Sequence, residues 1–307
     1  MSSGSPRAEA AGAGWEGRSR GTPLGHRIFI FLIKHVGLGA AYALLVPVTS
    51  YFVLTAGDAG RAYMHFFRRA RPEAGSGRWA TLFRAFHSFG QRLIDKVAIA
   101  GGLADRFAQH RTGGEHIQAL MDAGRGALLI SAHIGNWDMA AHLMKRYKGK
   151  VSVVMLEAED ARIRKAVEEA TEEKRFEVIP LGNDLSHMIR IKAAISEGRL
   201  ICIHGDRAMA GSRTAKHDFL GAPARFPLGP FAIAATLQVP VCVAFVLRGN
   251  DRSYRFHAFP PDPPDRDPKV HLDRFVARLE EVAHEHPEQW SNFFEFWIDE
   301  QPVATVR

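Results

Sequence analysis

The stretch Ala127-Leu128-Leu129-Ile130-Ser131-Ala132-His133-Ile134-Gly135-Asn136-Trp137-Asp138 carries the first clear signal of the fold. Its first five residues form a short apolar run that follows a glycine turn, which is typical of a buried strand. The polar residues after that run are expected where the strand ends and a helix begins. Because ligand sites of α/β sheets cluster beyond the carboxyl ends of strands, this stretch is also the first candidate for a functional site.

The same pattern repeats along the chain and predicts an α/β fold. Further strands are expected at 151–155, 177–180, 200–203 and 239–247, and helices at 160–174, 185–197 and 271–284. Residues 79–110 show apolar side chains at helical spacing, namely Leu82, Phe83, Phe86, Phe89, Leu93, Ile94 and Val97. Residues 219–230 and 256–269 are rich in Gly or Pro and are expected to be loops. The predicted architecture is a single-domain mixed sheet flanked by helices.

The chain divides into three parts. Residues 1–27 are rich in Gly, Ser, Ala and Arg and are expected to be a disordered tail. Residues 28–56 are nearly all apolar, and about 20 such residues suffice to cross a bilayer. This segment is expected to span the membrane once, to lie in its interface, or to pack as a buried helix. The arginines that follow it, Arg61 to Arg78, are typical of a cytoplasmic flank, so residues 57–307 are expected to form a domain on the cytosolic side of the membrane.

Composition limits the classes of function. The chain has 307 residues, 46% of them hydrophobic and 24% charged, which is the balance of a globular protein. A formal net charge of +7 indicates an anionic partner. A nucleic acid is not expected, because the basic stretches lack interleaved aromatic residues and no known nucleic-acid module is present. The two cysteines, Cys202 and Cys242, lie forty residues apart, which argues against a disulfide scaffold and against a cysteine zinc cluster.

His133 and Asp138 are the first candidates for chemistry. An aspartate in the first turn of the helix is expected to fold back so that its carboxylate meets one imidazole nitrogen, while the other nitrogen faces the cleft. That arrangement suits a general base acting on a hydroxyl or an amine. The alternatives are a solvated pair and a helix-capping aspartate. Gly135 is expected to allow a tight turn and to leave room for a substrate, and nearby backbone N–H groups are candidate oxyanion donors.

Two further segments are expected on the same rim of the sheet. His204-Gly205-Asp206-Arg207 follows another apolar strand. The segment 219–230 contains Arg225 and leads into an apolar helix, whose first N–H groups can hold an anionic group together with that guanidinium.

These residues, in this order, resemble the bacterial lipid A biosynthesis acyltransferase family within the lysophospholipid acyltransferase-like superfamily. The resemblance rests on H-x4-D at His133 and Asp138, on Gly205-Asp206-Arg207, and on the F-x-G-x-P-A-x-F-P-x-G-P pattern of residues 219–230. It covers roughly residues 26–300 and includes the aromatic ending at 290–297. It implies transfer of an acyl chain from an acyl carrier protein or coenzyme A thioester to a hydroxyl or amine of a membrane lipid, without a metal or a bound cofactor. It also implies that this reaction takes place at the cytoplasmic face of the inner membrane, with residues 57–307 as the acyltransferase domain.

By position, the resemblance implies that His133 is the general base, that Asp138 orients it, and that Asp206 lies near the acceptor. The candidate substrate-binding residues are Gly135, Asn136, Trp137, Asp206, Arg207, Gly221, Arg225 and Gly229. The best-known lipid A late acyltransferases tend to have Glu where this chain has Asp138. The acceptor is therefore open among lipid A, other glycolipids, aminolipids and polyene lipids.

Two interpretations from other classes stay open. A metal-dependent phosphoesterase would use a hard-ligand set formed by His133, Asp138, His204 and Asp206, extended by His217 and Asp218. It would be inactivated by chelators. A non-catalytic lipid-binding relative would keep its function on His133→Ala.

Overall fold

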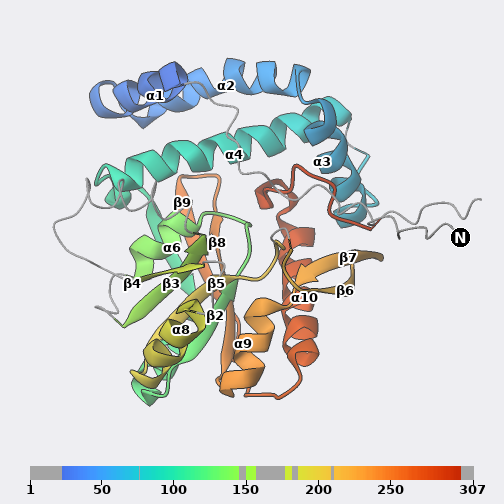
Figure 1. Cartoon of the computed structure of the whole chain (residues 1–307). Coiled ribbons are helices and arrows are strands. Elements are labelled where there is room, and N and C mark those ends of the chain that lie inside the picture. The colour runs from blue at the N-terminus through green and yellow to red at the C-terminus, as the bar shows by residue number, and fades with distance from the viewer. Residues whose placement is uncertain are drawn as a thin grey trace, which may run out of the picture.

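The computed structural model describes residues 23–75, 77–144, 150–156, 177–181, 186–208 and 211–298. Its centre is a seven-stranded sheet in the order β1-β9-β8-β2-β5-β3-β4 (Figure 1). The strands are β1 (Ala108–Thr112), β2 (Ala127–Ser131), β3 (Val151–Leu156), β4 (Glu177–Leu181), β5 (Leu200–His204), β8 (Val241–Arg248) and β9 (Ser253–Ala258). All neighbouring pairs are parallel except β8 and β9, so the sheet is mixed, as the sequence predicts.

The five strands expected from apolar runs are all present, whereas β1 and β9 are absent from the prediction. β1 is the short polar sequence AQHRT at the edge of the sheet, and nothing in its pattern indicates a strand. β9 does alternate, because Tyr254, Phe256 and Ala258 are buried on one face. Its end falls inside the segment expected to be a loop. The helix expected at 160–174 lies outside the described residues.

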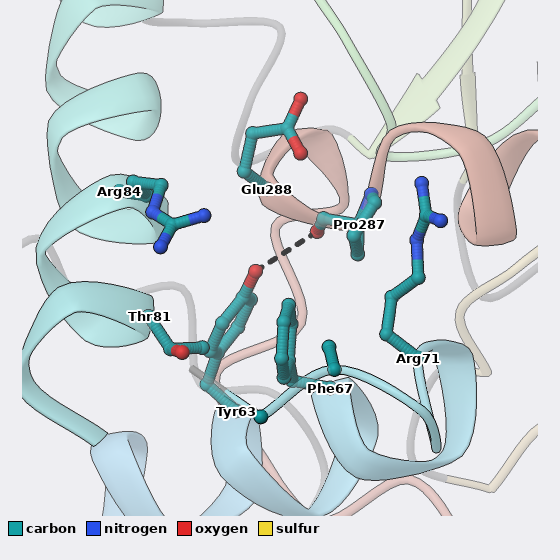
Figure 2. A pocket seen from close by; sticks show the side chains of 9 residues that line it. Tyr63, Phe67, Arg71, Thr81, Arg84, Pro287 and Glu288 are labelled. Carbon is teal, nitrogen blue, oxygen red and sulfur yellow. Dashed lines mark hydrogen bonds between the residues drawn. The ribbon is translucent and has the colours of Figure 1, made fainter. Parts of the chain in front are cut away.

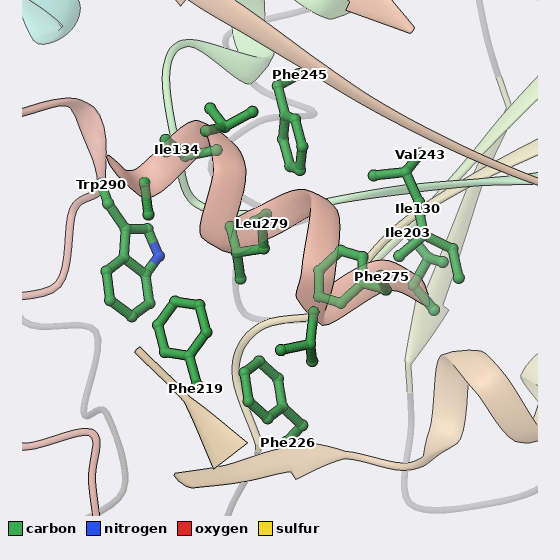
Figure 3. Packing of buried hydrophobic residues seen from close by; sticks show 14 of the residues in the cluster. Ile130, Ile134, Ile203, Phe219, Phe226, Val243, Phe245, Phe275, Leu279 and Trp290 are labelled. Carbon is green, nitrogen blue, oxygen red and sulfur yellow. The ribbon is translucent and has the colours of Figure 1, made fainter. Parts of the chain in front are cut away.

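Successive residues of the central strand β2 point to opposite faces and build two cores. Leu128 and Ile130 pack in a cluster with side chains of α8 (Ser186–Ser196), α9 (Gly229–Leu237) and α10 (Pro268–Glu285) (Figure 3). Ala127 and Leu129 pack on the other face with α5 (Gly114–Ala123), α6 (Trp137–Leu143) and part of α4 (Arg78–Ala100). Burial on both faces explains why β2 is apolar at every position but its last.

The apolar N-terminal segment forms two helices rather than one. α1 (Pro23–His35) and α2 (Leu38–Leu54) are separated at Val36 and Gly37, where Gly37 has a φ of 112°. Because α1 begins at Pro23, residues 23–27, which were expected to belong to the tail, are helical. α3 (Gly57–Ala70) follows. Among the described residues no single helix has the length and apolarity of a membrane span; α2 and α3 reach both only as a pair bent by 94°.

Helix α2 packs along α4 above the sheet (Figure 1). Leu38, Ala41, Leu45, Thr49 and Val53 form its buried stripe. The two helices approach closely at Gly90, where a Cβ would lie 2.5 Å from a methyl carbon of Leu45. The opposite side of α2 leaves apolar side chains uncovered.

The helix expected at 79–110 is shorter than predicted, because α4 ends at Ala100 and is followed by η1 (Ala104–Arg106) and β1. The apolar stripe predicted for this helix coincides only in part with the face that is buried in the structure. Leu82 and Ile94 are buried, but Leu93 is 46% exposed, while the charged residues Arg92 and Asp95 are 5% and 0% exposed. Charged groups are rarely buried without partners, so these two mark a polar network inside the protein.

The segment expected to be a loop at 219–230 is mostly a hairpin. β6 (Thr214–Phe219) and β7 (Ala222–Pro227) pair antiparallel through a turn at Leu220 and Gly221, and α9 begins at Gly229. Phe219 and Phe226 are fully buried against Trp290 and Phe296 of the C-terminal segment. The Nε1 of Trp297 donates to the carbonyl of Phe219 at 2.9 Å. The aromatic ending of the chain thus attaches this hairpin to the domain.

Candidate active site

His133 and Asp206 form a pair at the carboxyl ends of neighbouring parallel strands. Ser131 of β2 and His204 of β5 are register partners, so the two chain segments leave the sheet side by side. The Nδ1 atom of His133 lies 2.8 Å from Oδ1 of Asp206. The backbone N–H of His133 donates to Oδ2 of the same carboxylate at 2.9 Å. One carboxylate therefore fixes both the main chain and the ring of the histidine.

Asp206 is a buried anion. Its side chain is fully buried, and burial alone would raise its pKa. The charge and hydrogen bond of His133, together with Arg207 and His204, outweigh burial and hold the pKa of Asp206 well below its usual range. Trp290 Nε1 also donates to Oδ2, at 3.3 Å. Because an ionised carboxylate only accepts hydrogen bonds, Nδ1 of His133 carries a proton, and Nε2 is the nitrogen directed away from this hydrogen bond.

Asp138 occupies a different place from the one predicted. It lies in the first turn of α6, and its Oδ1 is 3.3 Å from Nζ of Lys96 on α4. Burial raises the pKa of Asp138, and the Lys96 ammonium acts in the opposite direction. The carboxylate that meets Nδ1 of His133 is that of Asp206, which the resemblance places near the acceptor. An orienting role for Asp138 stays a prediction.

Gly135 and Asn136 face the protein rather than a substrate. Gly135 has a φ of 71°, and a Cβ there would lie 2.0 Å from the carbonyl oxygen of Val246. Its N–H donates to the carbonyl of Gln289, and the N–H of Asn136 donates to that of Val246. The glycine thus allows the loop to pass close to β8 and does not leave an open space for a substrate. Both N–H groups already donate to backbone carbonyls of the protein. Asn136 is 3% exposed and caps α6.

The remaining candidates near His133 are His204, Trp137 and Arg207. The His204 ring centroid lies 4.4 Å from that of His133, and Trp137 is edge-on to His204 at 6.4 Å. Burial, followed by the charge of His133, lowers the pKa of His204 to about 3, so this ring is neutral at working pH. Nη2 of Arg207 donates to the carbonyl of Ser291 at 2.6 Å, and its guanidinium lies over Phe294.

The hairpin residues among the candidates are distributed over its surface. Gly221 lies in the β6–β7 turn, Arg225 is exposed on β7, and Gly229 is the first residue of α9. Their binding of substrate stays a prediction.

The structure gives the metal alternative no support. In the part of the chain that it describes, no group of three or more His, Cys, Asp or Glu side chains is arranged to hold a metal ion. His217 Nε2 instead lies 3.0 Å from Asp273 Oδ1, away from the His133 pair.

A cavity of about 340 Å³ opens between α3, α4 and η3 (Pro287–Gln289). Figure 2 shows Tyr63 and Phe67 forming its floor and the arginines Arg71 and Arg84 on opposite sides. Tyr63 Oη donates to the carbonyl of Pro287 at 3.0 Å and so attaches α3 to the C-terminal segment.

The buried guanidinium of Arg92 on α4 binds the same C-terminal segment. Arg92 donates to the carbonyl of Glu288 and to Ser291 Oγ, two residues before Phe293. Neither Arg92 nor its neighbours Asp95 and Lys96 are among the residues singled out from the sequence. The only signal for them is that α4 places charges among apolar residues.

The fold and the site together define a class of protein. A mixed α/β sheet carries at its rim a histidine whose ring is held by a buried carboxylate, an arrangement compatible with general-base chemistry. Residues 84–299 match the family model described as bacterial lipid A biosynthesis acyltransferase. The chain belongs to this family, and the resemblance found in its motifs is confirmed.

Relatives of known name agree with this family. The chain is 27% identical over 229 residues to a phosphatidylinositol mannoside acyltransferase of Mycobacterium tuberculosis (strain ATCC 25618 / H37Rv), a match that covers 72% of this chain and 66% of the relative. It is 31% identical over 121 residues to the phosphatidylinositol mannoside acyltransferase of Mycolicibacterium smegmatis, covering 39% of this chain and 40% of the relative. The matched regions thus span less than two thirds of each relative's length.

Proposed function

We propose that this protein is an acyltransferase that moves a fatty acyl chain from an acyl carrier protein or coenzyme A thioester to a hydroxyl or amine of a membrane lipid. The observation that carries the proposal is the His133 ring held at 2.8 Å by the buried Asp206 carboxylate. Family membership and the names of the relatives support acyl transfer to a lipid.

The reaction uses His133 as a general base. Its Nε2 takes the proton from the acceptor hydroxyl or amine as the oxygen or nitrogen attacks the thioester carbonyl. Asp206 stabilises the imidazolium that forms, and the ring then returns the proton to the leaving thiolate as the C–S bond breaks. The new bond is an ester or an amide, the by-product is the free thiol, and no electrons are exchanged with a further reactant. Arg207 is the candidate on this rim for stabilising the negative charge that develops on the carbonyl oxygen.

The acceptor is best supported as a glycolipid. The relatives are named for acylation of phosphatidylinositol mannoside, whose sugar hydroxyls are nucleophiles of the required kind. Lipid A belongs to the same broad chemical class, and the family description names it. A sugar hydroxyl needs a base to remove its proton at neutral pH, which matches a histidine fixed by a carboxylate.

Helices α1 and α2 supply a surface for lipid. Large apolar side chains on or between them are more than a third exposed, namely Leu24, Ile28, Ile30, Phe31, Val36, Val46, Tyr51 and Leu54. Monomeric proteins rarely expose contiguous apolar surface of this kind without a partner. We place this surface, the α1–α2 outer face, in the interface of the inner membrane at its cytoplasmic side.

Anionic head groups are the natural neighbours of this face. Arg61 and Arg68 are exposed on α3, Arg71 directly after it and Arg78 at the start of α4. Arg71 also borders the cavity of Figure 2, whose carboxylate is Glu288. Each such cation near an anionic bilayer contributes on the order of 1 kcal/mol of binding. An acidic acyl carrier protein would be attracted by the same charges.

A direct assay tests the proposal. Purified protein is incubated with long-chain acyl carrier protein or acyl-coenzyme A and with vesicles that contain candidate glycolipids, and thioester loss and acceptor acylation are followed by mass spectrometry. We expect acylated acceptor with the wild type and a loss of at least about 100-fold with His133→Ala. Full activity of His133→Ala, or no consumption of either thioester with any acceptor, would refute the mechanism. Retention of activity in a chelator would agree with a metal-independent reaction.

A further inference from the structure

A buried polar cluster joins α2, α4, β8 and β9. Its centre is the carboxylate of Asp95, which is 0% exposed. Nε of Arg248 donates to Oδ2 at 2.7 Å, and Oη of Tyr254 donates to the same oxygen at 2.5 Å. Oη of Tyr42 donates to Oδ1. The carboxylate is thus neutralised by one guanidinium and fixed by two phenols.

Of the two phenols, Tyr254 is the one that is hydrogen-bonded to a residue of the loop carrying His133. Oη of Tyr254 accepts a hydrogen bond of 2.9 Å from Nδ2 of Asn136. The other end of that amide, Oδ1, accepts from the N–H groups of Asp138 and Met139 at 3.1 and 3.3 Å. A directed chain of donors therefore runs from Asn136 through Tyr254 to Asp95.

This chain decides which way the amide of Asn136 points. An asparagine cap works only if its oxygen faces the free N–H groups at the start of the helix. Because the hydroxyl of Tyr254 donates its hydrogen bond to Asp95, its oxygen is left to accept from the NH2 group of Asn136 and holds that end of the amide. The oxygen end must then face α6. His133 lies three residues before this cap, in the loop that connects β2 to α6.

Other contacts hold the same loop to the neighbouring segment. Gln289 accepts the N–H of Gly135 with its main-chain oxygen, and its side chain pairs with both the N–H and the carbonyl of Arg248. Arg248 is therefore bound both to Asp95 and to the residue that anchors the loop. Burial, followed by the Asp95 charge, raises the pKa of Tyr254 far above the working range, so the phenol is always protonated.

We propose that Asp95 and Tyr254 are positioning residues for catalysis, which hold the Asn136 amide in its capping orientation and thereby set the loop that carries His133. The proposal rests on the proposed function of His133 and adds residues on α4 and β9 that touch neither the ring nor a substrate. Direct contact with a substrate is not expected for either residue, because both side chains are 0% exposed.

Tyr42 provides a matched control. It donates to the same carboxylate as Tyr254, but its other polar neighbours are guanidinium groups and not Asn136. Arg248 shares a hydrogen bond with it, and the guanidinium groups of Arg248 and Arg252 lie 5.5 and 5.3 Å from its ring centroid. Tyr42→Phe and Tyr254→Phe each remove one phenol donor from the buried carboxylate of Asp95. Only Tyr254→Phe removes the acceptor for Asn136.

The experiment compares these two variants with the wild type in three measurements on the full chain. These are the urea midpoint of unfolding, kcat and KM for acyl transfer, and amide hydrogen exchange of the peptide that covers residues 132–143. We expect both variants to lower the urea midpoint by similar amounts. Tyr254→Phe should lower kcat by about tenfold or more with KM within about twofold, and should speed exchange in the loop peptide. Tyr42→Phe should leave kcat and loop exchange within about twofold of the wild type.

The proposal is overturned if both variants lose kcat equally, or if loop exchange in Tyr254→Phe equals that in Tyr42→Phe. Its failure is distinguishable from failure of the proposed function. A wild type that consumes no thioester would refute acyl transfer, yet hydrogen exchange would still decide whether Tyr254 orders the loop.

Discussion

Nδ1 of His133 lies 2.8 Å from Oδ1 of Asp206, and the two residues come from segments that are 73 positions apart in the chain. The pair forms because β2 and β5 are parallel neighbours whose ends, Ser131 and His204, are in register. Burial of the carboxylate makes the interaction strong, since water does not compete for its oxygens. The geometry of the sheet thus creates the base that the proposed reaction needs.

The backbone of the His133 loop requires glycine at position 135. We expect Gly135→Ala to destabilise the protein strongly, because the new methyl group would meet the Val246 carbonyl oxygen at 2.0 Å in addition to the strain of a φ of 71°. Gly221→Ala is the control, because φ there is 74° but a Cβ meets nothing within 4 Å. Urea unfolding should give a loss of about 1 kcal/mol for Gly221→Ala and at least twice that for Gly135→Ala. Equal losses would contradict the close contact.

We expect burial of His204 to lower the free energy of unfolding in mild acid relative to neutral pH. Burial lowers its pKa from 6.5 to about 3, so below pH 6.5 the unfolded chain binds a proton that the folded protein excludes. The stability due to the neutral ring is full above pH 6.5 and is lost as the pH falls toward 3. Between about pH 7.5 and 5.5 this amounts to about 1.4 kcal/mol for one group. The free energy of unfolding of His204→Gln should fall less over this interval; an identical pH dependence would show that His204 is not the responsible group.

The α1–α2 outer face should determine binding to lipid. Replacing Phe31 and Leu54 by serine removes two side chains that are 59% and 75% exposed, so the fold should lose little stability. Sedimentation with vesicles containing anionic lipid should show binding weakened by at least about tenfold, given about 1.5 to 3 kcal/mol for each large apolar side chain buried. Ile189→Ser on α8 is the control, because Ile189 is 71% exposed but lies outside this face. Equal vesicle binding by the double variant and the wild type would contradict the assignment.

The sequence predicts the five apolar strands of the sheet, because each of them is a local signal, and it misses the edge pair β1 and β9. Continuous apolar runs such as 127–131 and 200–203 identify buried parallel strands without any knowledge of their neighbours. The hairpin at 214–227 is different, since Gly221 and the prolines around it are typical of a loop until the pairing of Phe219 with Ala222 is known. The two N-terminal helices likewise appear as one apolar run, because a single glycine with positive φ makes the break.

The carboxylate that pairs with His133 cannot be predicted from residues nearby in the sequence. Spacing along the chain favours Asp138, five residues away, whereas the order of strands in the sheet brings Asp206 to the ring. The same holds for Asp95, which lies among apolar residues of α4 but whose hydrogen-bond partners come from α2, β8 and β9. The sequence singles out His133 and Asp206 as candidates, but the fold determines that these two residues pair.

Which carboxylate acts on His133 is measured most directly by comparing Asp206→Asn with Asp138→Asn. The first substitution places an amide where Nδ1 now meets a carboxylate, so the imidazolium loses its counter-charge and the proton is no longer fixed on Nδ1. The second removes only the ion pair with Lys96. We predict that kcat for acyl transfer falls by at least about 100-fold in Asp206→Asn and by less than about tenfold in Asp138→Asn, with both variants folded by circular dichroism. A larger loss in Asp138→Asn than in Asp206→Asn would contradict the account.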